Sequence, residues 1–263
     1  MQPKVHDYCI KETFEILYND SRLSVINSLF DRRKVGISPS DCIKYMQHGS
    51  YIIDRLSVKK LKLHWFGGHY LYPHSHAGYI KGFSDAGTKC SQLFHIALKD
   101  WKKGNFKKSF VALGGAMHLV QDLCIPFHTT NLALKKHITF ERWMSSNYLE
   151  LPMELEGGIY SFKPLKHHYS DKTPFGWVDY NAHNSSKHLP ELLYAGTRAD
   201  YFNSLRRILP EAIKTSAGFI ELFTEKASHA ESDPFYFSRE SVRRDLKLKV
   251  RSLRGKKAQK LLT

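Results

Sequence analysis

Two pairs of histidine and acidic residues, each four positions apart, carry the clearest chemical signal in this sequence. They are His118 with Asp122 and His137 with Glu141. In a helix, side chains four positions apart lie on one face, so each pair would present an imidazole and a carboxylate together. These side-chain types, with no thiolate required, suit a catalytic Zn²⁺ that keeps open positions for water.

The spacing alone is weak evidence, and the surrounding sequence decides which pairs matter. His118 and Asp122 fall in the most apolar predicted helix, where an unpaired carboxylate would be costly. A metal ion or a purely structural His–Asp hydrogen bond would offset that cost, and the spacing does not choose between them. Two further pairs lie in polar sequence and are interpreted as chance: His167 with Asp171 and His229 with Asp233.

The segments that must position these residues are predicted to be helices. Apolar residues recur with helical spacing, whereas the alternation typical of strands is scarce. Pro126 should end the helix that carries Asp122 and let His128 turn back toward it. We predict an all-α, single-domain helical bundle over residues 1–230. The expected helices are 5–18, two segments within 21–48, 77–103, 106–124, 134–149 and 199–227, while 49–75 and 150–180 are expected to be irregular.

Length and composition limit the class of protein. The chain has 263 residues, 42% of them hydrophobic, which is enough to bury a large core. We find no apolar run long enough to span a membrane and no export signal at the start, and the compartment is left open. Four cysteines without a CxxC motif are interpreted as buried free thiols.

The net charge of +15 favours binding to polyanions such as nucleic acid or anionic lipid. Ten of the 40 cationic residues lie between Arg239 and Lys260, within a basic C-terminal extension, 231–263. This extension is either a solvated basic end or a membrane-surface segment. In the second case its deletion should reduce vesicle binding in a salt-dependent way.

The stretch from His118 to Asn131 resembles the signature of the zinc-dependent bacterial phospholipase C family. The positions in register are His118, Asp122, Leu123, Pro126, His128 and Asn131; those that depart are Leu119, Gln121, Cys124 and Thr130. Further family-like segments appear in the right order along residues 5–226: His6 in a first helix, Gly49–Asp54, Phe66–Pro73, His137 with Glu141, and Lys214–Phe223.

The resemblance implies an all-α bundle with a polynuclear zinc cleft. One zinc would take Asp54, His69, His118 and Asp122; a second His128, His137 and Glu141; and a third His6 with a shared Asp122. Family members complete the third site with the amine and carbonyl of an N-terminal Trp. This sequence has no such Trp, so two zinc ions are expected and the third depends on a substitute such as the Met1 amine.

The activity implied by the resemblance is hydrolysis of glycerophospholipids to diacylglycerol and a phosphorylated headgroup. Asp54 would also act as general base on the attacking water. Phe66 and Arg55 are the candidate substrate-binding residues. Choline-preferring members have an aromatic residue at the position of Arg55, so we expect this chain to favour acidic phospholipids.

Two alternatives remain open from the sequence. One is a zinc nuclease of the S1/P1 type, which the net charge would suit, or another phosphoesterase. The residues around Asp122 and the presence of Glu141 rather than Asp favour the lipase. The other is a non-catalytic relative that associates with membranes or nucleic acid. We expect a phospholipid at a membrane surface as the partner, nucleic acid to be less favoured, and a monomer; the family is usually secreted.

Overall fold

The computed structural model describes residues 1–31, 35–60, 68–79, 84–131, 134–151, 153, 155–163 and 169–232, with backbone alone for 54–60, 134 and 230–232. The helices, in chain order, are α1 (Pro3–Asn19), α2 (Leu23–Phe30), α4 (Pro39–Lys60), α5 (Ala86–Lys102), α6 (Phe106–Asp122), η1 (Pro126–Thr129), α7 (Leu134–Asn147), η2 (Tyr148–Glu150), α8 (Pro174–Ser186), α9 (Leu189–Tyr194) and α10 (Arg198–Ser232). The predicted C-terminal extension lies outside these residues except for its start, which continues α10.

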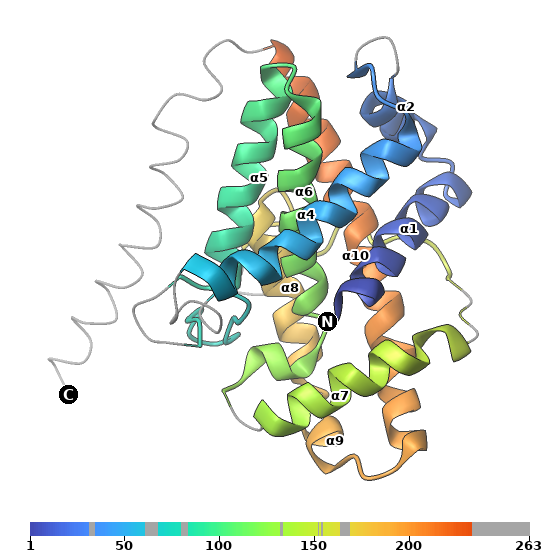
Figure 1. Ribbon diagram of the computed structural model, residues 1–263, viewed down its shortest axis with the longest axis vertical. Helices are drawn as coiled ribbons and strands as arrows, with labels where there is room; N and C mark the ends of the chain where they lie inside the picture. Colours follow the sequence, from blue (N-terminus) through green and yellow to red (C-terminus); the bar gives the residue numbers. More distant parts are fainter. Residues whose placement is uncertain are drawn as a thin grey trace, which may run out of the picture.

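The fold is all-α, as predicted. Within the described ranges the β-structure is limited to one isolated bridge between Tyr72 and Ala77. Helix α6 lies at the centre of the bundle and runs beside α5 (Figure 1). Helix α4 crosses α6 obliquely, and α10 packs against α6 as well. Most side chains of α6 are buried, including His118 and Asp122, so the apolar sequence of this helix predicted its central position correctly. Helix α7 lies across the end of the bundle where α6 stops (Figure 1).

Two glycines allow α4 and α6 to cross in close contact. A Cβ on Gly49 of α4 would lie 1.9 Å from the carbonyl oxygen of Val111, and one on Gly114 of α6 would lie 1.9 Å from that of Met46. Only glycine permits the two backbones to approach this closely. The crossing brings Ser50, which is buried, beside the C-terminal half of α6, where the candidate ligands lie.

Several predicted boundaries were wrong. The sequence from residue 49 was expected to be irregular, but α4 continues to Lys60 because Gly49 serves the helix crossing rather than breaking the helix. Helix α5 begins only at Ala86, after Asp85 accepts a hydrogen bond from the backbone N–H of Thr88 as the N-cap.

The predicted loop over 150–180 contains the start of a helix that the sequence analysis missed. Pro174 occupies the first turn of α8, where its missing N–H costs nothing, and Thr173 caps the helix through the N–H of Gly176. The last predicted helix corresponds to α10, which continues through Pro210. No helix among the described residues is long and apolar enough to cross a membrane.

Candidate metal centre

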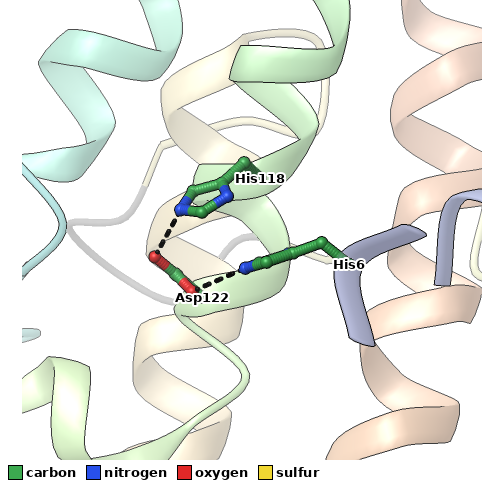
Figure 2. Close-up of side chains that lie close together, drawn as sticks. All are labelled: His6, His118 and Asp122. Carbon is green, nitrogen blue, oxygen red and sulfur yellow. Dashed lines mark ion pairs between the residues drawn. The ribbon is translucent and has the colours of Figure 1, made fainter. Parts of the chain in front are cut away.

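Seven histidine and acidic side chains predicted as metal ligands meet at one place. We call this set the Asp122 cluster. Its members come from α1, the segment 68–79, α6, η1 and α7: His6, His69, His118, Asp122, His128, His137 and Glu141. Figure 2 shows His6 from α1 and His118 from α6 both directed at the carboxylate of Asp122.

The two oxygens of Asp122 face two different groups of ligands. Oδ2 lies 2.9 Å from Nδ1 of His69 and 3.0 Å from Nε2 of His118. Oδ1 lies 3.3 Å from Nε2 of His6 and 3.8 Å from Nε2 of His128. One carboxylate is therefore placed between two sets of nitrogens, which is the arrangement a residue shared by two metal ions requires.

Glu141 organises a third group beside the first two. Its Oε1 lies 2.9 Å from Nε2 of His137 and 3.2 Å from Nε2 of His128, and these two nitrogens are 3.1 Å apart. The pair His137 and Glu141 is four residues apart on α7, while His128 comes from η1 after Pro126. The turn at Pro126 thus returns His128 to the ligand cluster, as the sequence predicted.

The α-amine of Met1 lies between the two carboxylates. It is 2.6 Å from Oδ1 of Asp122 and 2.9 Å from Oε1 of Glu141, and it is fully buried. The space between the carboxylates of Asp122 and Glu141 therefore favours a positively charged group.

Neighbouring groups orient the imidazoles. His6 donates from Nδ1 to Oε1 of Gln121 at 2.7 Å, and His128 donates from Nδ1 to the carbonyl oxygen of His69 at 2.8 Å. In both residues Nε2 then carries a lone pair directed into the cluster. The hydroxyl of Ser50 lies 3.2 Å from Nδ1 of His118, and the hydroxyl of Tyr70 lies 3.2 Å from Nδ1 of His137. These contacts orient two further imidazole rings.

The donor set fits a metal ion. Nε2 of His6 is buried and makes no hydrogen bond to any of the residues described, although it faces Oδ1 of Asp122. A lone pair aimed at a carboxylate oxygen is repulsive unless a cation lies between them. Imidazole and carboxylate ligands without thiolate are the set expected for a hydrolytic zinc site.

The electrostatics keep the cluster ready for a cation at neutral pH. Burial lowers the pKa of His6 and of His69 to about 4 each, and it also lowers the pKa of His137. Burial alone would raise the pKa of Asp122 and of Glu141, but the nearby imidazoles and the N-terminal amine hold both well below their usual values. Neutral imidazoles and ionised carboxylates are the forms that bind metal ions.

Three predicted residues lie outside this description. The backbone of Asp54 and Arg55 belongs to α4, one helical turn beyond Ser50, but their side chains are outside the described residues, as is all of Phe66. Conversely, three residues that orient the imidazoles were not predicted from the sequence: Ser50, Tyr70 and Gln121. Gln121 was visible only as a departure from the family signature, where no bonding partner could be foreseen.

We compared the chain with protein families, curated proteins and solved structures. No protein-family model matches the chain. A phospholipase C from Paraclostridium bifermentans is 24% identical over 145 residues, which cover 52% of this chain and 36% of that protein.

Two solved structures share the fold. The alpha toxin from Clostridium absonum has a TM-score of 0.68 at 16% identity, covering 89% of this chain and 65% of its own. An alpha-toxin from an avian strain of Clostridium perfringens has a TM-score of 0.64 at 16% identity, covering 86% and 64%. The all-α bundle is therefore the fold of the alpha-toxins, and the chain spans less than two thirds of these relatives.

The sequence match and the fold together confirm the resemblance to the bacterial zinc-dependent phospholipase C family.

Proposed function

We propose that this chain is a zinc-dependent phospholipase C that releases diacylglycerol and a phosphorylated headgroup from glycerophospholipids. The observation that supports this most strongly is the convergence of His6, His69, His118, Asp122, His128, His137 and Glu141 from five segments of the chain. The likeness to a protein named phospholipase C supplies the reaction class.

The three groupings around the carboxylates suggest how the ligands are divided. Each ion would take groups that lie together, with Asp54 added to the first by resemblance. The proposed sets are Asp54, His69, His118 and Asp122; His128, His137 and Glu141; and His6 with the shared Asp122. The first two sets are complete in side chains, and the third has two side-chain ligands.

The chemistry that zinc supplies when bound is neutralisation of the phosphodiester charge and a water whose pKa is lowered toward about 7. The chain's own groups do the rest. Asp54 is the proposed general base toward the attacking water. Hydrogen bonds hold four imidazole rings of the Asp122 cluster in fixed orientations, which limits the reorganisation needed during the reaction. The partners are Gln121, Ser50, Tyr70 and the carbonyl of His69.

Headgroup choice is proposed to depend on Arg55. A guanidinium pairs with an anionic headgroup and repels a quaternary ammonium. We expect faster turnover of phosphatidylglycerol or phosphatidylserine than of phosphatidylcholine in vesicles of matched acyl composition. Faster turnover of phosphatidylcholine would contradict this assignment.

The decisive experiment measures metal content and runs parallel assays on phospholipid vesicles and on single-stranded DNA. We expect release of diacylglycerol that stops with 1,10-phenanthroline and returns with added zinc. Chelator-sensitive DNA cleavage without lipid hydrolysis would instead identify a nuclease. Bound zinc without either activity would identify a non-catalytic relative.

A further inference from the structure

A second group of metal-binding side chains lies apart from the Asp122 cluster, at the contact between the segment 68–79 and α8. We call it the Asp179 cluster: His76, Asp179 and His183. Nε2 of His76 lies 2.9 Å from Oδ1 of Asp179, and Nε2 of His183 lies 3.6 Å from the same oxygen. One ligand atom from each residue lies within 4.8 Å of the others.

We propose that the Asp179 cluster binds one divalent transition-metal ion of the zinc type, independently of the proposed catalytic centre. A tetrahedral zinc with bonds of 2.0–2.2 Å separates its ligand atoms by about 3.3–3.6 Å. The observed distances from Oδ1 of Asp179 to the two nitrogens, 2.9 and 3.6 Å, lie close to this range. The carbonyl oxygen of Pro73, 3.2 Å from Nε2 of His183, would supply a fourth ligand atom.

Local structure holds the three groups toward one another. Asp179 and His183 are four residues apart on α8 and therefore share a face. The backbone N–H of Tyr169 donates a long hydrogen bond, 3.4 Å, to Oδ2 of Asp179, which leaves Oδ1 directed at the imidazoles. His76 approaches from the turn closed by the Tyr72–Ala77 bridge.

The backbone of His76 adds an independent observation. Its φ of +51° is in the left-handed region that non-glycine residues seldom adopt. Strain of this kind is concentrated at functional sites, and here it accompanies a ring that faces Asp179. The ring also packs edge-on against Tyr169 and Phe175, which fixes its plane.

Burial and charge suit a cation that enters from solvent. Asp179 is 1% exposed, whereas His76 and His183 are 20% and 11% exposed. A buried carboxylate bordered by accessible imidazoles gives the ion both a negative partner and a route of entry. Binding requires each Nε2 to present its lone pair, with the ring proton held on Nδ1, so zinc displaces the hydrogen bonds that these nitrogens make to Asp179 and Pro73.

The test compares zinc content among single variants of the full-length chain. We expect His183→Ala and His76→Asn to bind about one zinc fewer per chain than the wild type after dialysis against zinc. Asparagine is chosen at His76 because it tolerates a positive φ. His74→Ala is the matched control: His74 is exposed, and its ring packs edge-on against that of His183 at a centroid distance of 5.7 Å, but it is not in the cluster.

Anomalous diffraction above and below the zinc edge from zinc-soaked crystals should show a peak between the three side chains. Equal zinc content in all variants, or maps without that peak, would overturn the proposal and leave a structural hydrogen-bonded contact. Lipid hydrolysis by His183→Ala should stay within about twofold of the wild type, because no residue of the Asp122 cluster is changed. Failure of the catalytic proposal would instead appear as absent activity in every variant.

Discussion

The Asp122 cluster and the Asp179 cluster use the same chemical motif in different settings. Each places imidazoles around one buried carboxylate, and in each a histidine lies four residues from that carboxylate on a helix. The Asp122 cluster, however, gathers ligands from five segments, is almost fully buried and includes a second carboxylate, Glu141. The Asp179 cluster joins two segments and leaves both imidazoles partly accessible.

This difference indicates what the proposed polynuclear centre would require beyond a single metal site. A lone His–Asp–His set can hold one ion and brace a turn against a helix. Two or more adjacent ions need a carboxylate with a ligand group on each oxygen, as at Asp122, and additional negative charge nearby to offset the repulsion between the ions. We therefore expect the two clusters to respond very differently to equivalent substitutions.

The largest contrast should come from removing the charge of each central carboxylate. Asp122→Asn should lose most of its bound zinc and reduce lipid hydrolysis on the order of 10³-fold or more, because both ligand groups around this side chain are disrupted. Asp179→Asn should lose about one zinc and keep activity within about twofold. Metal analysis and vesicle assays check both variants, and similar activity losses would break the distinction between the clusters.

A narrower effect is expected at Asp54. Asp54→Asn should retain most zinc but lower turnover by about 10²–10⁴-fold, the usual range for a general base. Turnover number and zinc content are measured on the same preparation. Retention of both would show that the base is another group, whereas loss of both would show that metal binding is the main role of this carboxylate.

Gln121 offers a test of how the Asp122 cluster is supported. Gln121→Ala removes the acceptor for Nδ1 of His6 and the amide that donates to Ser216 at 3.1 Å. Loss of such an orienting partner typically weakens metal affinity 10–100-fold. Competition with a chromogenic chelator measures that affinity. Gln47→Ala is the matched control, since the side-chain amide of Gln47 donates to the backbone carbonyl of Asp7 in α1 at 3.2 Å and not to the ring of His6.

The smallest effect is expected at the cysteines, which take part in neither cluster. All four are free and buried, as the sequence analysis predicted, and burial raises the pKa of Cys9 to about 12 and that of Cys42 to about 11. Few thiolates are therefore present at pH 8, and native protein should react slowly with a thiol reagent. Full reaction of all four thiols should require denaturant; rapid reaction of one in the native protein would refute the assignment.

The features of the Asp122 cluster that depend on neighbouring residues in the chain could be predicted from the sequence. Residues four apart on a helix, such as His118 with Asp122, share a face whatever the rest of the protein does. Pro126 had to end α6, because proline has no N–H and restricts the residue before it. The apolar sequence of α6 likewise predicted a buried helix, and a family resemblance then placed the remaining ligands in order.

The rest depended on contacts between residues distant in the chain. Gly49 resembles a helix breaker until Val111 is found against it, and Pro174 resembles a loop residue until it is seen in the first turn of α8. A search for histidine followed by an acid also overlooked Asp179 and His183, in which the order is reversed. Residues four apart on a helix share a face in either order. His76, however, lies more than one hundred residues away in the chain, and only tertiary packing brings it to the carboxylate of Asp179.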